Sequence, residues 1–191
     1  MKTFVIVDNY EPIKPLHRAY WYFLADSAIS NTGKPFYLPE NLGKTIVHLG
    51  IVLKIDRLGK GIHPEYASRY YSEYAPALHF TLPDYENRLK ECDLPLDGSR
   101  SFDRSLIVGE FRNKIDFQPL ILKVNGEPRC SFEIEKLHLK DKDIIFSVSQ
   151  MNTLKMGDFI VPGLNRGSEL KEGDFIEVFQ GVERSFHVKV K

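Results

Sequence analysis

The sequence has few cysteines, no excess of charge of either sign and no long apolar run. Its two cysteines, Cys92 and Cys130, have no C-x-x-C spacing, so we expect two reduced thiols rather than a disulfide. Basic and acidic residues are equal in number, 26 of each, so no global field attracts nucleic acid or an anionic membrane, and we expect neither partner. No apolar stretch approaches the roughly 20 residues that span a bilayer.

The N-terminus predicts a strand rather than a targeting segment. The apolar run Phe4–Val7 ends before Asp8 and is too short for the core of a signal peptide. We therefore expect a cytoplasmic protein. With 191 residues, 42% of them hydrophobic, and no repeat or linker-like stretch, the chain is expected to form a single domain over residues 1–191.

Short strands dominate the pattern. Thr45–Asp56 is rich in β-branched residues and gives the strongest strand signal, while Ala19–Leu24 fits a buried strand or turn. The Asn125-Gly126 pair predicts a type I′ hairpin turn between two strands. The other predicted strands are Leu106–Phe111, Gln118–Val124, Arg129–Leu137, Asp158–Val161, Phe175–Gln180 and Phe186–Val190.

Three short segments have helical signals. His63–Tyr74 opens with an early proline and is expected to form a polar, tyrosine-rich helix. Thr81 is placed as the N-cap of a helix that runs to about Glu91. Asp143–Gln150 is the third candidate. The sequence therefore predicts a mainly β protein of the α+β class.

Known catalytic motifs are missing. The chain has no G-x-S-x-G, no P-loop, no G-x-G-x-x-G and no H-E-x-x-H. These absences give no support for a serine hydrolase, a P-loop enzyme, a dinucleotide enzyme or a zinc protease.

Several stretches, in order along nearly the whole chain, together resemble the small single-domain form of the fumarylacetoacetate hydrolase family. The resemblance implies a mixed β-roll fold and a homodimer. The matching stretches are the opening strand that ends in Asn9-Tyr10, LKIDRLGKGI, HFTLPDYENRL, SFDRSLIVGEF, VNGEPR, TLKMGDFIVPG and LKEGDFIEV.

The resemblance also implies a chemistry. The family holds Mg²⁺ or Mn²⁺ with two glutamates and one aspartate, because hard cations prefer anionic oxygens. The metal binds an oxo acid and stabilises the enolate formed when a C–C bond breaks. A His–Glu pair near the N-terminus activates water, and a lysine and a threonine position the substrate.

This chain departs from the family pattern at each of those positions. By resemblance, the two glutamate positions fall on His48 and Gly50, and the aspartate position falls on His79. The remaining departures are Ile13 and Leu16 at the His–Glu pair, Arg100 at the lysine before Phe102-Asp103, and Val161-Pro162-Gly163 at the terminal G-T-P.

The two histidines leave two interpretations open. His48 and His79 together could bind a borderline metal such as Zn²⁺ or Ni²⁺, with Asp103 or Asp84 as a third ligand. Alternatively, both imidazoles fill a collapsed site through hydrogen bonds. An imidazole also titrates near neutrality, so His79 is the candidate catalytic residue.

The candidates for ligand binding are Tyr10, Arg100 and Asp103. Arg100 could grip a carboxylate with two hydrogen bonds, or could neutralise Asp103. Tyr10 could line a pocket or pack in the core.

Two hypotheses of function follow. In the first, the chain keeps the fold but has lost the Mg²⁺ chemistry, needs no cofactor, and acts as a module that binds a small molecule or a protein. In the second, it is a diverged hydrolase, decarboxylase or isomerase of small oxo acids that uses His48 and His79 in place of the carboxylate ligands. Both hypotheses expect a homodimer and allow a small carboxylate or oxo-acid ligand.

Overall fold

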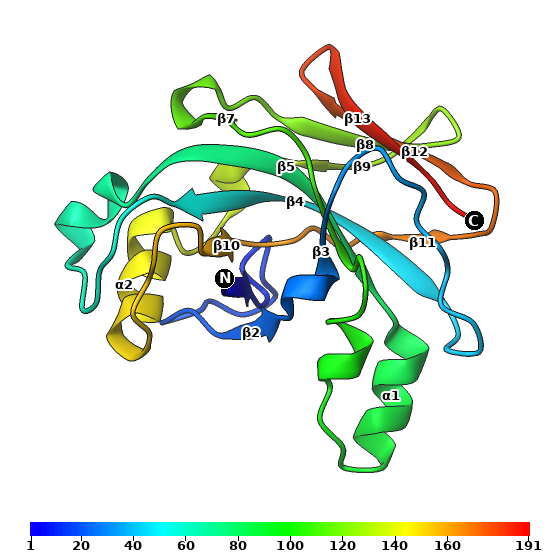
Figure 1. The fold of residues 1–191 in the computed structure, drawn as a ribbon, viewed down its shortest axis with the longest axis horizontal. Coiled ribbons are helices and arrows are strands. Elements are labelled where there is room, and N and C mark those ends of the chain that lie inside the picture. Colours follow the sequence, from blue (N-terminus) through cyan, green and yellow to red (C-terminus); the bar gives the residue numbers. More distant parts are fainter.

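The computed structural model describes residues 1–191 and consists mostly of β-strands (Figure 1). The strands are β1 (Thr3–Ile6), β2 (Trp21–Leu24), β3 (Ile29–Asn31), β4 (Thr45–Ile55), β5 (Tyr71–Thr81), β6 (Leu106–Val108), β7 (Arg112–Asn113), β8 (Leu120–Val124), β9 (Glu127–Phe132), β10 (Phe159–Val161), β11 (Ser168–Leu170), β12 (Phe175–Gln180) and β13 (Glu183–Lys189). The α-helices are α1 (Pro83–Glu91) and α2 (Asp141–Met151), and short 3-10 helices span Asp26–Ala28, Pro64–Arg69, Asp97–Ser99, Lys114–Asp116 and Ile134–Lys136. The prediction of a mainly β fold with short helices is confirmed.

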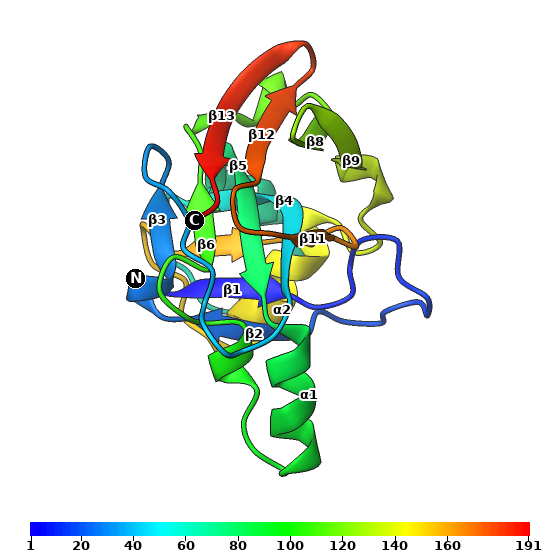
Figure 2. The same ribbon diagram turned by 90° about the vertical axis from the view of Figure 1, so that its right-hand side faces the viewer.

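The strands form two sheets. The larger sheet has nine strands in the order β2-β1-β10-β4-β5-β6-β3, with β11 paired to β4 and β7 paired to β5. The smaller sheet has four strands in the order β13-β12-β8-β9. Seen from the side, the smaller sheet lies across one end of the molecule and α1 projects from the opposite end (Figure 2). Most connections within the smaller sheet are hairpins, whereas the larger sheet joins strands from both ends of the chain.

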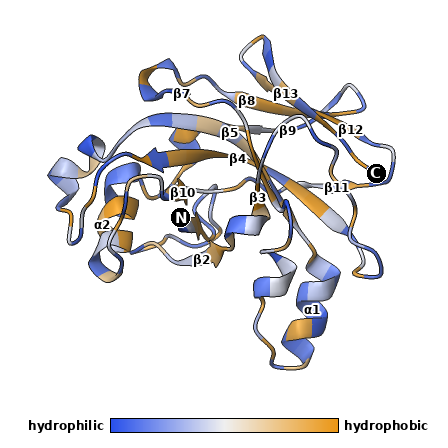
Figure 3. Ribbon diagram, in the orientation of Figure 1, coloured by the Kyte–Doolittle hydropathy of each residue, from blue (hydrophilic) through white to orange (hydrophobic).

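The long antiparallel pair β4–β5 forms the centre of the larger sheet. Its register places His48 directly opposite His79, so both imidazoles lie on the same face of the sheet. Runs in the middle of both strands are continuously buried, because the sheet is covered on both faces. These strands are correspondingly hydrophobic along their central parts (Figure 3).

The two faces of β4 and β5 pack against different cores. One face, which carries Leu49 and Leu78, joins a cluster of 34 buried residues with the smaller sheet and α2. The other face carries small residues such as Ala75 and Ala77 and joins a cluster of 9 buried residues with β1 and β6. The histidine pair lies on this second face, where the sheet approaches the loop after β1.

The predicted helix at His63–Tyr74 is wrong over its second half. A 3-10 helix covers Pro64–Arg69, and β5 begins at Tyr71. Pairing with β4 satisfies the backbone groups from Tyr71 onward, and this ladder outweighs the helical spacing of the tyrosines.

Most of the remaining element predictions are confirmed to within a few residues. The strand predicted over Arg129–Leu137 is an exception, because β9 ends at Phe132 and a 3-10 helix covers Ile134–Lys136. The strand predicted within Ala19–Leu24 is β2, but only its last residue is buried.

In the β8–β9 turn both Asn125 and Gly126 have positive φ, 54° and 83°, as a type I′ turn requires. Neither α-helix has the length and apolar content that crossing a bilayer requires. The assignment of residues 1–191 to one domain stays a prediction.

Candidate small-molecule site

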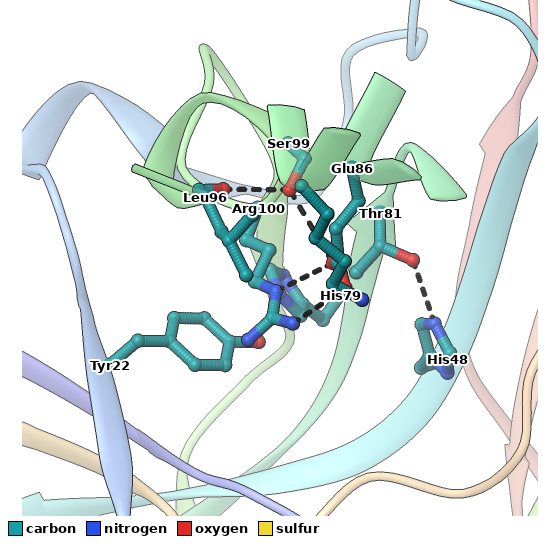
Figure 4. Close-up of polar contacts among 9 residues, drawn as sticks. Tyr22, His48, His79, Thr81, Glu86, Leu96, Ser99 and Arg100 are labelled. Atoms are coloured by element: carbon teal, nitrogen blue, oxygen red, sulfur yellow. Dashed lines mark hydrogen bonds and ion pairs between the residues drawn. The ribbon is translucent and has the colours of Figure 1, made fainter. Parts of the chain in front are cut away.

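A cavity of about 750 Å³ opens between the N-terminal part of β4, the first turns of α1 and the loop that follows β1. Of the residues predicted from the sequence, it is lined by Tyr10, His48 and Arg100. Tyr22, Thr81 and Glu86 add further polar side chains to its wall. Figure 4 shows how the side chains of His48, Arg100, Tyr22, Thr81 and Glu86 lie relative to one another and to His79 of β5.

His48 presents its imidazole to the cavity with both ring nitrogens in hydrogen bonds. Nδ1 lies 2.8 Å from the carbonyl oxygen of Asn165, and Nε2 lies 2.9 Å from Oγ1 of Thr81. Burial lowers the pKa of the imidazole, and the Asn165 carbonyl opposes that shift only in part. The ring is therefore neutral at neutral pH and has one nitrogen lone pair, directed at Thr81.

His79 lies one strand away and does not reach the cavity. It is fully buried, with Nδ1 2.7 Å from the carbonyl oxygen of Ser105 and Nε2 2.8 Å from the hydroxyl of Tyr22. Burial, followed by the nearby imidazole of His48, lowers its pKa to about 3. The predicted catalytic candidate therefore contacts the cavity only through Tyr22, which itself lines the wall.

Arg100 and Glu86 form a bidentate ion pair on the cavity wall. Arg100 donates from Nε and from Nη2 to the two carboxylate oxygens of Glu86, at 2.8 and 2.9 Å. These hydrogen bonds hold the pKa of Glu86 at about 2, and Lys90 adds a further ion pair at 2.7 Å. The guanidinium carbon lies 5.0 Å from the ring centroid of Tyr22. Arg100 Nη1 makes no hydrogen bond within the protein, so it keeps a donor for a ligand.

The other predicted binding residues have different roles. Arg100 pairs with Glu86, not with Asp103, which is exposed and lies outside the cavity wall. Tyr10 is 7% exposed, and its hydroxyl donates to the carbonyl of Ser131 and accepts from the N–H of Glu133. Tyr10 therefore lines the cavity while serving chiefly as a packed core residue.

The residues present do not fit a hard divalent cation. A side chain at Gly50 would meet the carbonyl oxygen of Gly163 at 2.7 Å, so the second glutamate position inferred from the resemblance has no room for a ligand. Ile46, the preceding residue on the same face of β4, offers no ligand atom. Asp84 accepts a hydrogen bond from the backbone N–H of Lys44 and lies outside the cavity wall.

No group of three or more His, Cys, Asp or Glu side chains is placed to hold a metal ion. The predicted Zn²⁺ or Ni²⁺ site therefore has two imidazoles and no third ligand, whereas a tetrahedral zinc site needs at least three protein ligands.

Sequence reasoning missed several polar residues of the site. Thr81 was assigned as a helix cap, but the N-cap of α1 is Leu82 and Thr81 bonds His48 instead. The Asn165 side chain accepts hydrogen bonds from the N–H groups of Leu49 and Gly167, which folds its loop over β4. Tyr22 and Glu86 come from β2 and α1, and no local pattern links them to the histidines.

Comparison with known proteins shows the family to which the chain belongs. The fumarylacetoacetate hydrolase C-terminal family profile matches residues 7–182. The mitochondrial oxaloacetate tautomerase of Rattus norvegicus is 32% identical over 160 residues, which cover 79% of this chain and 71% of that protein. An oxaloacetate tautomerase of Escherichia coli is 25% identical over 160 residues, 80% of this chain and 73% of that protein.

Solved structures agree on the fold. A fumarylpyruvate hydrolase from Pseudomonas aeruginosa, in complex with Mn²⁺ and pyruvate, superposes with a TM-score of 0.88 at 20% identity. The match covers 100% of this chain and 89% of that one. A 5-carboxymethyl-2-hydroxymuconate delta-isomerase from Mycobacterium smegmatis gives a TM-score of 0.85 at 16% identity, covering 99% and 78% of the two chains.

Proposed function

Because the chain belongs to the fumarylacetoacetate hydrolase family, we propose that it binds a small oxo acid in the cavity beside β4 and interconverts its keto and enol forms. The observation that carries the proposal is the placement of the His48 imidazole and the Arg100 guanidinium on the wall of the same cavity. The names of the related tautomerases support the choice of substrate class.

Arg100 anchors the substrate in this proposal. Its unbonded Nη1 donates to a carboxylate oxygen, while Glu86 keeps the guanidinium plane fixed. Stacking of the guanidinium over Tyr22 restricts it further. The anchor therefore favours an oxo acid with a carboxylate next to the carbon that reacts.

His48 moves the proton. When Thr81 turns its hydroxyl away, neutral Nε2 accepts a proton from the carbon beside the ketone, and the C–H electron pair forms the enol double bond. The imidazolium then returns that proton to the substrate oxygen, so no atom is gained or lost. Burial lowers the pKa of His48, which favours the return of the proton.

Tautomerisation is favoured over the other chemistries open to an oxo acid. It needs one proton to move between carbon and oxygen. Hydrolysis or decarboxylation must in addition break a C–C bond, and no cluster of ligand side chains is placed to hold a metal ion that would stabilise the electron pair released.

The test is the rate of oxaloacetate enol–keto interconversion at neutral pH, with and without the protein. We expect His48→Gln to reduce the rate constant kcat by about 10²–10⁴-fold, the usual contribution of a positioned acid–base group. We expect Arg100→Gln to raise KM, because it removes the anchor. Asp103→Asn, an exposed position outside the cavity, is the matched control. An unchanged rate in His48→Gln would contradict the proposed proton transfer.

A second candidate is binding without turnover. It is favoured by the hydrogen bond that already occupies Nε2 of His48 and by the lowered pKa of that imidazole. Calorimetric titration with pyruvate and oxaloacetate separates the two candidates. Binding that Arg100→Gln abolishes, without any acceleration of tautomerisation, supports this candidate, and no binding at all contradicts both.

The predicted homodimer is carried forward as a proposal about the assembly. Sedimentation velocity at micromolar protein checks it. A single species at the monomer mass of 22.0 kDa would contradict it.

A further inference from the structure

Two hydroxyl groups hold the outer nitrogens of the histidine pair. The Tyr22 hydroxyl lies 2.8 Å from Nε2 of His79, and the Thr81 hydroxyl lies 2.9 Å from Nε2 of His48. Thr81 is the last residue of β5, and Tyr22 belongs to β2 at the edge of the larger sheet. The two hydroxyls therefore reach the pair from different elements (Figure 4).

The inner nitrogens determine which way those bonds run. Nδ1 of His48 faces the carbonyl oxygen of Asn165, and Nδ1 of His79 faces the carbonyl oxygen of Ser105. A carbonyl oxygen only accepts hydrogen bonds, so both Nδ1 atoms carry protons. In a neutral ring Nε2 then holds the lone pair and accepts from the hydroxyl.

We propose that the hydroxyls of Tyr22 and Thr81 prevent metal ions from binding to the His48–His79 pair. Each hydroxyl occupies the Nε2 lone pair of one imidazole, so the pair binds no metal. A histidine binds a metal through a nitrogen lone pair, and here both lone pairs are already used. Position 50, two residues along β4, has no room for a further ligand because the Gly163 carbonyl covers it. The proposal concerns metal binding at the two imidazoles and does not depend on the proposed tautomerase activity.

The first test is a thermal melt of metal-stripped protein with Mg²⁺, Mn²⁺, Zn²⁺ or Ni²⁺. We expect no shift that depends on His48. A stabilising shift with any of the four ions that His48→Gln removes would overturn the proposal. The comparison with His48→Gln excludes ions that bind at the exposed histidines.

The second test frees both lone pairs. The double variant Tyr22→Ala/Thr81→Ala removes both hydroxyls and opens space beside each Nε2. We expect it to gain a Zn²⁺ or Ni²⁺ shift of about 3–5 °C at a tenfold excess over Kd, which disappears when His48→Gln is added. A folded double variant that gains no shift would contradict a closing role for the hydroxyls.

A matched control removes the same groups elsewhere. The double variant Tyr10→Ala/Thr3→Ala takes away a tyrosine that lines the same cavity and a buried threonine whose hydroxyl has no partner, and neither hydroxyl hydrogen-bonds an imidazole. We expect it to gain no shift with any ion. A shift equal to that of the Tyr22→Ala/Thr81→Ala variant would mean that cavity opening, not the loss of the hydroxyls, admits the metal.

A measurement on the unaltered protein keeps the proposal testable if the variants do not fold. Nitrogen-15 NMR of the imidazoles distinguishes the two neutral tautomers. We expect both His48 and His79 to carry the proton on Nδ1 at neutral pH. A proton on Nε2 of either ring would overturn the proposal, because that nitrogen would then donate to the hydroxyl.

Discussion

The strands of the smaller sheet and those at the centre of the larger sheet differ in how their residues are buried. In β8 and β12 buried residues alternate with partly exposed ones, and the predicted site residues are all outside this sheet. In β4 and β5 burial is continuous through the middle of each strand, and polar side chains stand at one end of the buried stretch. The smaller sheet covers a core, while the larger sheet also builds the cavity.

The difference shows what burial demands of a polar residue. A polar side chain on an alternating strand can face water and needs no partner. His79 is fully buried, so each of its nitrogens requires a hydrogen bond from elsewhere in the chain. Ser105 and Tyr22 supply those bonds and come from segments 26 and 57 residues away. The site is therefore assembled by partners that local sequence does not reveal.

The largest effect is expected in the core of the larger sheet. Phe80 is fully buried in β5 and stacks on Phe36 with ring centroids 3.8 Å apart. We expect Phe80→Ala to lower the free energy of unfolding by about 3–5 kcal/mol, through lost burial and the cavity left behind. Denaturant unfolding measures it. Val182→Ala, at a 95% exposed turn of the smaller sheet, should stay within about 0.5 kcal/mol.

The second-largest effect is expected in the pH dependence of the free energy of unfolding, to which His79 contributes. Its pKa is lowered from 6.5 to about 3 on folding, so the unfolded chain binds one more proton between those values. The stability contributed by the neutral buried ring is complete above pH 6.5 and falls as the pH drops toward 3. At pH 5 the loss relative to neutral pH is about 2 kcal/mol from this group.

Unfolding curves of the wild type and of His79→Gln at pH 7 and pH 5 check this prediction. The variant is expected to be less stable at pH 7 and to lose less stability between the two pH values. His187→Gln removes an imidazole from an exposed position of the smaller sheet and is the control. An identical pH dependence in the wild type and His79→Gln would contradict the prediction, because it would show that folding does not lower the pKa of His79.

The smallest effect is expected in the β8–β9 turn. Gly126 has a φ of 83°, and a Cβ at that position would meet no atom within 4 Å. Gly126→Ala therefore adds conformational strain and no clash, and we expect a loss of about 1 kcal/mol. Thermal unfolding measures it. A loss as large as that of Phe80→Ala would mean that this turn, like the larger sheet, determines the fold.

Sequence patterns predicted most of the fold because most strands are local and regular. The β-branched run at Thr45–Ile55 and the Asn125-Gly126 turn each specify their own conformation. The failure at Tyr71–Tyr74 has a clear cause. These residues are strand only because β4 offers a partner ladder, and the sequence of the segment alone favoured a helix.

The site was predicted in part. His48 and Arg100 line the cavity, and the resemblance to the family singled them out because they stand at one of its metal-ligand positions and at its lysine position. Tyr10, for which the sequence left a pocket or a core role open, lines the cavity and is also packed in the core. The partner of Arg100 was not predicted: the adjacent Asp103 is exposed, and Glu86 reaches the guanidinium from α1. Spatial neighbours brought by a helix are not recoverable from sequence spacing alone.

The parallel pairing of β1 with β10 has a consequence for when the molecule can fold. Thr3 lies beside Phe159 in the sheet, so β1 finds its inner neighbour only after the chain has been synthesised as far as Phe159. At a translation rate of about 5–20 residues per second, that interval lasts roughly 8–30 s. Until then β1 has only β2 beside it, on its outer side. The larger sheet therefore closes only once β10 has been synthesised, and the free edge of β1 must avoid other nascent chains in the meantime.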